Sequence, residues 1–346
     1  MKEYIVAFMS HANKLLQTST EEFKHGLSIS VKPHANQDIS HTTKGSITID
    51  EASQLHDVNS VPDQFAELFE KSWLEKDDKV TLSIASQLQH ISCMSVHKNT
   101  SLRITEGVHG LFIIAQKNSQ STINITSTTN TSIRMHIVCE ENSSLTINHI
   151  QEGKSFILKK VHVKKDAQVY FNDVLTTNSY ARLYQQVTLL GENSTAKQKV
   201  ISLTYDDAIA DIYTLSDHAQ EHSYSDIITR SVITDSSKTL SRGLVKIQRM
   251  AAHSEGYEKQ DALMLSKNCE ADAIPNLEIH NHNVKCSHGS TVGRIDTDKL
   301  FYLMSRGLSE SHAKKEIVKA YFQPILEEFA DTSLHEHITN ILEEKI

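Results

Sequence analysis

Two side chains able to bind a metal, Cys286 and His288, lie two residues apart in the last fifth of the chain. If the segment around them is a β-strand, both project from the same face, because side chains alternate along a strand. A thiolate beside an imidazole can bind a metal or act as a nucleophile. The alternative is a buried cysteine that packs as a small apolar residue, and a chain with 20 histidines gives one Cys–His spacing less weight.

Three further candidate donors precede this pair, at Glu278, His280 and His282. On an unbroken strand they would share the face of Cys286. However, residues 281–283 read Asn-His-Asn, which is typical of a corner and would interrupt the alternation. These three residues are therefore candidate additional ligands, with a solvated turn as the alternative.

Composition excludes several classes of protein. The chain has 346 residues, a net charge of -8 and 38% hydrophobic residues, enough for a packed core in one large domain or two to three ordinary ones. The acidic balance argues against nucleic-acid binding. No apolar run approaches the roughly 18 residues needed to span a membrane, and residues 1–16 do not resemble a signal peptide. We expect a cytoplasmic protein that binds neither nucleic acid nor membrane.

The four cysteines show no paired spacing and are expected to be free thiols in a reducing compartment. Cys93 and Cys139 lie in alternating runs and are expected to pack within strands. Cys269 lies in a polar turn that favours exposure, and it receives no functional assignment.

The chain divides into three parts. Residues 1–78 are expected to form an N-terminal helix and strand region, with helices over 1–26 and from Pro62 to Leu74, and strands over 27–31 and 46–50. Residues 79–295 consist of short alternating runs separated by polar corners. Residues 296–346 are predicted to be helical.

The corners of the middle part carry Asn or Asp followed by small residues, at Asn99, Asn118, Asn142, Asp166 and Asn193. Their separations of 19, 24, 24 and 27 residues are too long for hairpins and fit the coils of a solenoid. Asn and Asp suit such corners because they tolerate left-handed backbone. Since parallel crossovers are right-handed, the pattern predicts a mainly β protein built as a right-handed parallel β-helix, with an antiparallel β-sandwich as the alternative.

The C-terminal part shows clear helix signals. Asp296 is a suitable N-cap for a helix that ends at Gly307, and Ser309 can begin a longer helix that Pro324 should bend. The apolar positions of a final amphipathic helix are Leu334, Ile338, Ile341 and Leu342. This apolar surface can bind a partner or pack on the β region.

The end of the β region resembles the SufB/SufD family, the scaffold subunits of the Suf iron–sulfur cluster assembly machine. The resemblance covers about 230–326 and rests on five blocks in register. These are Ser241–Ile247 (S-R-G-L-V-K-I), Ala251–Ser266 (A-A-H-S-E-G-Y-E-K-Q-D-A-L-M-L-S), Ala271–Ile279 (A-D-A-I-P-N-L-E-I), Val284–Ile295 (V-K-C-S-H-G-S-T-V-G-R-I) and Leu300–Leu308 (L-F-Y-L-M-S-R-G-L).

The resemblance implies a right-handed parallel β-helix whose C-terminal helical region, 296–346, docks on an ABC-type ATPase (SufC-like). It implies a second SufB/SufD-type protomer and a transient iron–sulfur cluster or iron as cargo. Cys286 and His288 would then be ligands at the protomer interface. The candidate contacts to the ATPase are Phe301, Tyr302, Arg306, Ile317 and Tyr321.

The Val-Lys-Cys-Ser-His-Gly segment is closer to the SufD type. SufB-type chains usually carry a glutamate where Gly289 stands and a cysteine where Gln260 stands. Two departures from the SufD type are His280–Asn283, which is usually a Tyr-Ala-Asp-Asp-like stretch, and the short N-terminal region. A scaffold that pairs with itself, as in minimal two-component Suf systems, is therefore the alternative to a heterodimer.

No enzyme motif accompanies the resemblance. The chain lacks a Walker-type phosphate loop, a nucleophile elbow and a dinucleotide fingerprint, so we expect a non-catalytic scaffold that binds no nucleotide and leaves ATP hydrolysis to its partner. Carbohydrate-active β-helices are the rival class, but their sites need clustered carboxylates or basic residues. The coils here present mostly Ser, Thr and Asn.

Overall fold

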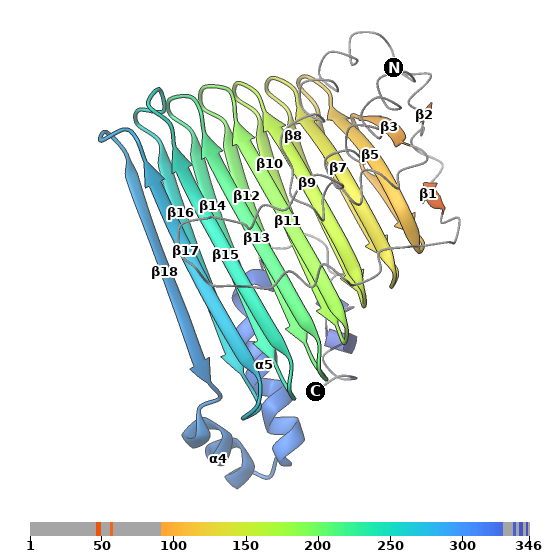
Figure 1. The fold of residues 1–346 in the computed structure, drawn as a ribbon, viewed down its shortest axis with the longest axis vertical. Helices are drawn as coiled ribbons and strands as arrows, with labels where there is room; N and C mark the ends of the chain where they lie inside the picture. Colours follow the sequence, from red (N-terminus) through yellow and green to blue (C-terminus); the bar gives the residue numbers. More distant parts are fainter. Residues whose placement is uncertain are drawn as a thin grey trace, which may run out of the picture.

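The computed structural model describes residues 46–49, 56–57, 91–327 and, near the C-terminus, 335–336, 339–341 and 344. These ranges form a parallel β-solenoid of about seven turns followed by helices, which confirms the predicted fold class (Figure 1). The strand expected over 46–50 is present as β1 (Ile47–Ile49). The other N-terminal predictions, over 1–26, 27–31 and 62–74, and most of the final helix lie outside the described residues.

Two nine-stranded sheets make the solenoid, and successive strands alternate between them. Beyond β1, sheet A contains β4 (Thr100–Ile104), β6 (Gln120–Ser127), β8 (Ser144–Glu152), β10 (Gln168–Thr177), β12 (Thr195–Thr204), β14 (Tyr224–Ile233), β16 (Glu255–Met264) and β18 (Lys285–Arg294). Sheet B contains β2 (His56–Asp57), β3 (Ile91–Val96), β5 (Gly107–Ala115), β7 (Thr131–Cys139), β9 (Ser155–Val163), β11 (Tyr180–Leu189), β13 (Ile209–His218), β15 (Lys238–Ile247) and β17 (Glu270–Ile279).

Strand pairing decides between the solenoid and the sandwich. From β3 onward, the described strands pair in parallel with the strand two places along the chain, as β16 does with β18 and β15 with β17. The antiparallel pairs of the described residues, β1 with β4 and β2 with β3, lie at the N-terminal end. The antiparallel sandwich is therefore excluded.

The predicted corners are left-handed turns. Asn118, Asn142, Asp166 and Asn193 have φ angles between 55° and 59°. Asn99 does not share this conformation; instead its Oδ1 accepts the Thr122 N–H at 3.0 Å, one coil further on. Corners of successive coils also bond each other: Nδ2 of Asn142 donates to Oδ1 of Asn118, and Nδ2 of Asn193 donates to Oδ1 of Asp166, both at 2.9 Å. A ladder of amides thus fixes the stacking of successive coils.

Later coils are longer and replace the amide with imidazole. Stacked positions lie 24 residues apart at Asn124 and Asn148 but 30 apart at Glu255 and Lys285. His222 and His253 take the left-handed corner position, both with φ of 58°, and their rings stack with centroids 5.0 Å apart. The sequence pattern missed these corners because histidine is not a usual turn residue.

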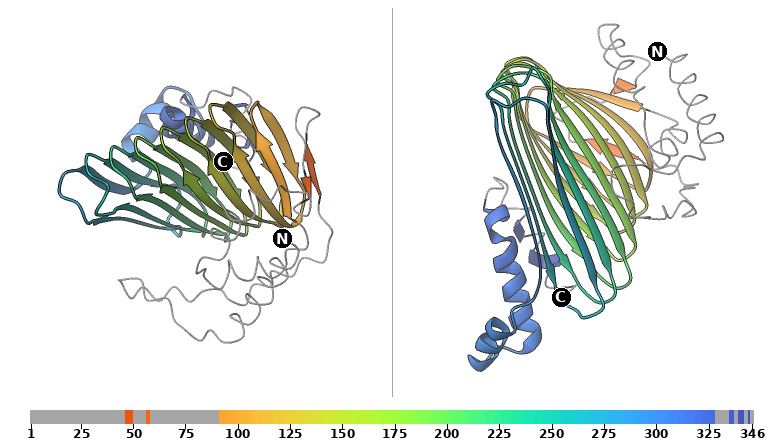
Figure 2. Two further views of the ribbon diagram at one scale, coloured as in Figure 1. Left: turned by 90° about the horizontal axis from the view of Figure 1, so that it is seen from above. Right: turned by 60° about the vertical axis from the view of Figure 1, so that its left-hand side comes forward.

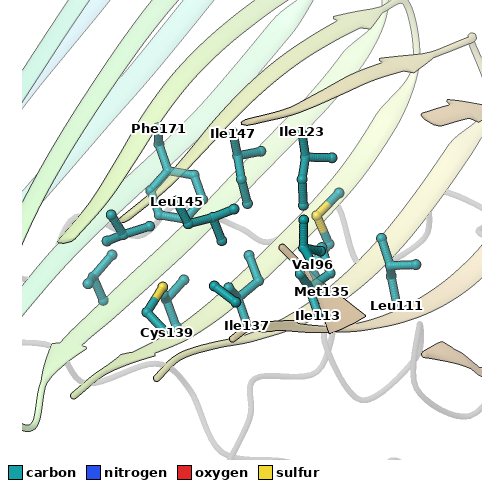
Figure 3. Packing of buried hydrophobic residues seen from close by; sticks show 14 of the residues in the cluster. Val96, Leu111, Ile113, Ile123, Met135, Ile137, Cys139, Leu145, Ile147 and Phe171 are labelled. Carbon is teal, nitrogen blue, oxygen red and sulfur yellow. The ribbon is translucent and has the colours of Figure 1, made fainter. Parts of the chain in front are cut away.

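The inner faces of the early coils form an apolar core. Ile113, Ile137, Ile147 and Phe171 come from different strands of both sheets and meet between them (Figure 3). Cys139 lies in the same cluster and Cys93 is buried, as expected from their alternating runs. Layers of branched side chains are a common way to fill the space between stacked coils.

Further along, the interior becomes polar. Lys159 of sheet B forms a buried ion pair with Asp173 of sheet A. Toward the C-terminal end, Gln185 Nε2 donates to Gln198 Oε1 at 3.1 Å, and Gln198 Nε2 donates to Ser216 Oγ at 2.8 Å. All of these side chains point between the sheets and are buried. In the last coils, buried Glu258 and Gln260 lie beside an apolar cluster that contains Ile227, Val245 and Ile247.

Two helices follow the solenoid. Helix α4 (Thr297–Ser305) is capped by Asp296 and precedes Gly307, whose φ is 99°. Helix α5 (Glu310–Leu326) is capped by Ser309, so both predicted caps are confirmed. The apolar side of α5 packs on the outer face of sheet A, and α4 extends beyond it (Figure 2). No helix in the described ranges is long and apolar enough to cross a membrane.

The amide ladder makes a prediction for stability. Asn142→Ala should lower the free energy of unfolding by about 1–2 kcal/mol, because alanine is strained in the left-handed region and cannot bond Asn118. Asn142→Gly should lose less, since glycine adopts this backbone without strain. Urea denaturation of both variants measures the difference. Equal losses for alanine and glycine would contradict the role assigned to the backbone.

Candidate metal centre

The last coil of the solenoid ends in two strands with a free side. Strand β18 pairs with β16, and β17 pairs with β15; among the described strands none lies beyond either of them. In Figure 1, β18 forms the end of the solenoid opposite β1 to β3. Each of these two strands is ten residues long. Their outer edges therefore carry backbone N–H and C=O groups that this coil does not pair.

The register of β18 places Cys286 and His288 on the inner face of this coil. Cys286 stacks on Gly256 and His288 on Glu258 of β16. Gly256 and Glu258 are buried, and the residues between and beside them are more exposed, so this phase of the strand points into the solenoid. The common face predicted for Cys286 and His288 is confirmed. At about 3.3 Å per residue, their Cα atoms lie about 7 Å apart along the strand.

The two side chains differ in their surroundings. Cys286 is partly buried against an apolar cluster that includes Ile227, Val245 and Ile247. His288 is exposed, because no further coil covers it. The partly exposed Cys286 thiol thus lies at the open end of the solenoid.

Burial raises the pKa of the Cys286 thiol, the Gly256 backbone N–H lowers it, and the negative charge of Glu255 raises it further. The net effect is a pKa above the ordinary thiol value, so the group is protonated at neutral pH. A bare thiol is a poor nucleophile and a poor ligand. A cation that binds Cys286 must therefore displace the proton, which makes binding tighter as the pH rises.

The structure does not bring Glu278 and His280 to this face. Glu278 projects outward from β17, where its Oε1 lies 2.8 Å from His280 Nε2 and 3.1 Å from Lys246 Nζ. Those two partners, His280 first, lower the pKa of the Glu278 carboxyl. His282 is exposed in the corner between β17 and β18. The corner over 280–284 interrupts the alternation of side chains, so the phase of β17 does not carry over to β18.

Glu258 is an inward-facing carboxylate that the sequence pattern did not reveal. It is buried under His288, and burial raises its pKa to about 7 although Gln260 and the Asn276 backbone N–H lower it. Tyr257 and Leu263 lie on the opposite, outward face of β16. Because an aromatic and an aliphatic residue are usually expected to face inward, the sequence of β16 alone suggests that Glu258 faces solvent. Across the described residues, no three His, Cys, Asp or Glu side chains are gathered closely enough to hold a metal.

The candidate partner-binding residues divide into two groups. Phe301 and Tyr302 of α4 are 73% and 57% exposed, and the Arg306 guanidinium lies over the Tyr302 ring at 5.3 Å. No residue of α4 is buried. Tyr321 instead contacts the chain's own sheet A, with the Arg230 guanidinium 5.4 Å from its ring centroid. Ile317 is partly buried on the same helix. The exposed patch on this side of the molecule, hereafter the α4 patch, is thus Phe301, Tyr302 and Arg306.

A family model described as "SUF system FeS cluster assembly, SufBD core domain" matches residues 97–321, which include almost the whole solenoid, α4 and most of α5. The chain belongs to the SufBD family. The matched range contains both the Cys286–His288 pair and the α4 patch.

Individual relatives that are similar to this SufBD protein belong to the same family. The iron-sulfur cluster assembly protein SufD of Escherichia coli is 29% identical over 174 residues, which is 50% of this chain and 41% of the relative. A SufBD family protein of Staphylococcus epidermidis is 26% identical over 174 residues, 50% of this chain and 37% of the relative. One from Mycobacterium tuberculosis is 29% identical over 176 residues, 50% of this chain and 21% of the relative. The matches thus span less than half of the length of these curated relatives.

The remaining thiols of this SufBD protein are less accessible than Cys286. Cys269 is 6% exposed, because its Sγ donates to the Ser266 carbonyl at 3.1 Å and its side chain packs in a cluster with Ile233 and Ala262. The exposure that its polar turn suggested is therefore wrong. Burial raises the pKa of Cys139 to about 12. Cys286 is the one cysteine of the chain that is not buried.

Thiol labelling tests this description of the site. Cys286 should react with iodoacetamide before the other three cysteines, and its rate should still be rising above the ordinary thiol pKa of about 8.5, because only the thiolate reacts. Peptide mapping by mass spectrometry across a pH series measures both. Cys286→Ser should abolish the fast phase and Cys269→Ser should preserve it. A rate that levels off below pH 8 would contradict the raised pKa.

Proposed function

We propose that this SufBD protein is a non-catalytic scaffold subunit that holds iron or a nascent iron–sulfur cluster between two protomers. The observation that carries the proposal is the open last coil: two free strand edges flank Cys286 and His288, which face the same opening. A free edge is a surface on which another chain can continue the sheet. A second SufB/SufD-type protomer that pairs with β17 and β18 would enclose the two side chains.

Cys286 and His288 are ligand types that suit iron or an iron–sulfur cluster. Thiolate and imidazole are the usual protein ligands of iron and of iron–sulfur clusters. Two donors from one chain leave a four-coordinate site half complete. The raised pKa of Cys286 agrees with a site that is assembled on demand, since the thiol becomes a ligand only when a cation displaces its proton. The second protomer supplies the missing ligands and closes the site to solvent.

The α4 patch is the proposed docking surface for an ABC-type ATPase of the SufC kind. Aromatic residues and arginine are the residues most enriched at protein interfaces. Phe301 and Tyr302 expose large apolar areas on a helix that has no buried residue of its own. Helix α5, by contrast, is held on sheet A by Val318, Phe322 and Ile325. One helix thus anchors the C-terminal part and the other presents the contact surface.

Binding to the ATPase tests this surface. Phe301→Ala combined with Tyr302→Ala should weaken the affinity for a purified SufC-type ATPase roughly 10- to 100-fold, because two exposed aromatic anchors are lost. Isothermal titration calorimetry measures the change. Met250→Ala is the matched control, since Met250 is 70% exposed but lies at a corner of the solenoid. Unchanged affinity in the double variant, or no complex at micromolar concentration, would contradict the proposal.

Iron content tests the site. Cys286→Ala should lower the iron bound per assembled complex to less than about a third, because a thiolate is the strongest ligand that this chain offers to iron. Iron is measured after anaerobic reconstitution, both for this chain with itself and for this chain with a SufB-type protomer. The pairing that retains iron identifies the partner. Cys269→Ala is the control, and iron content in Cys286→Ala equal to that of the wild type would remove the assignment.

A further inference from the structure

Glu258 is a buried carboxylate that has no cation partner in the described part of the chain. It is 4% exposed, and its Oε1 accepts a hydrogen bond from Gln260 Nε2 at 2.6 Å. Its Oε2 has no hydrogen-bond partner among the described residues. Burying a charged carboxylate without a cation is unfavourable by several kcal/mol in general, so such a group either takes up a proton or is paired with a cation.

The other carboxylates of the last two coils do not share this position. Most of them face outward and lie within ion-pair distance of a lysine. These pairs are Glu255 with Lys285, Asp261 with Lys259, Glu270 with Lys238 and Glu278 with Lys246. Glu258 differs because its phase on β16 directs it between the sheets, where no lysine reaches it. Among the described residues Glu258 has a hydrogen-bond partner in Gln260 but no cation to offset its burial.

The space around Glu258 is shaped for a carboxylate. Its side chain crosses the interior from sheet A to Gly243 of sheet B, where a Cβ atom would lie 1.5 Å from Oε1. Any other residue at position 243 would displace the carboxylate. The Asn276 backbone N–H of the last coil also bonds it. The carboxylate therefore lies inside the solenoid, directly beside the last, open coil.

Cys286 and His288 lie next to Glu258 on the neighbouring strand. Glu258 is the register partner of His288, and Gly256 is the partner of Cys286. Neighbouring strands lie about 4.8 Å apart, and the three positions face the same side. In the present conformation the carboxylate is turned toward Gly243, and the three groups do not yet form a closed set. For the three groups to share one ligand, the Glu258 side chain must rotate away from Gln260.

We propose that Glu258 is the third ligand that this chain supplies to the cation held by Cys286 and His288, an inference that rests on the proposed function. A thiolate and a carboxylate together carry two negative charges, which match a divalent cation, and the imidazole adds a neutral nitrogen. Sulfur, nitrogen and oxygen donors in this combination suit Fe²⁺, Co²⁺ and Zn²⁺. One position of a tetrahedral site remains for a ligand from the second protomer. The cation would also supply the positive charge that the buried carboxylate lacks.

Cobalt binding to the full-length chain tests the proposal, because Co²⁺ reports its ligands in the absorption spectrum. Titration of the wild type with Co²⁺ under anaerobic conditions should give a sulfur-to-cobalt charge-transfer band that Cys286→Ser abolishes. Glu258→Gln should retain this band, since the thiolate still binds, but weaken Co²⁺ binding at least 10-fold. Glu258→Asp, which keeps the carboxylate, should recover part of the affinity. Glu270→Gln removes an outward carboxylate of the last coil, which pairs with Lys238, and should bind Co²⁺ as the wild type does.

The outcomes are distinguishable. If the wild type shows a Cys286-dependent band and Glu258→Gln binds Co²⁺ with unchanged affinity, Glu258 is not a ligand and the proposed function stands. If the wild type shows no Cys286-dependent band, the proposed site fails and this inference fails with it. Thermal unfolding of the metal-free variant is the check on folding. Because a neutral amide is easier to bury than an unpaired carboxylate, Glu258→Gln without metal should be at least as stable as the wild type.

Discussion

The stacking of parallel strands is the constraint on which the rest of this molecule depends. Each coil satisfies half of its backbone hydrogen bonds with the coil before it and half with the coil after it. At the N-terminal end of the described residues, β1 and β2 pair antiparallel with β4 and β3 and so occupy the first edges. At the other end, β17 and β18 have no such neighbour among the described strands. The two ends are therefore unequal, and the end that carries Cys286 and His288 is the one left open.

The interior of the solenoid also changes between its N-terminal and C-terminal ends. Its early coils are filled by branched apolar side chains such as Ile113 and Ile137, which need no partner other than each other. Later coils place Gln198, Glu258 and Gln260 between the sheets. A polar interior is less stabilising than an apolar one, because each buried group must be hydrogen-bonded. These polar groups lie in the coils that lead to Cys286, where the proposed function gives them a chemical use.

The fold was largely predictable from the sequence because its determinants are local. Asn118, Asn142 and Asp166 mark corners by their own backbone preference. Asp296 and Ser309 begin helices through side-chain hydrogen bonds to residues two or three positions away. Each signal is read from a few adjacent residues, so no knowledge of the neighbouring coil is needed. The corners at His222 and His253 were missed for the same reason, since their conformation depends on stacking between coils.

The site was less predictable because it depends on which face of each strand points inward. Cys286 and His288 share a face whichever way β18 is turned, and that part of the prediction did not require the structure. Whether Glu278 faces the same side as Cys286 and His288 depends on the corner between β17 and β18. That corner interrupts the alternation of side chains, so Glu278 faces outward. Glu258 was hidden because Tyr257 lies on the outer face of β16, where an aromatic residue would not be expected. Alternation alone gives two faces, and the register with the preceding coils decides which one is inside.

The edge strand β18, which carries Cys286 and His288, and the α4 patch follow one another closely in the chain. Strand β18 ends at Arg294 and α4 begins at Thr297, so only two residues connect the edge strand to this helix. In the proposed complex, a cation that takes ligands from both protomers binds more tightly when the protomers are paired. Pairing is in turn tighter when the cation is bound, because the two equilibria share one coupling free energy. An ATPase that moves α4 would change the pairing of β18 and, through it, the affinity for the cation. Binding and release of the cargo would thus be controlled by the geometry of a single strand.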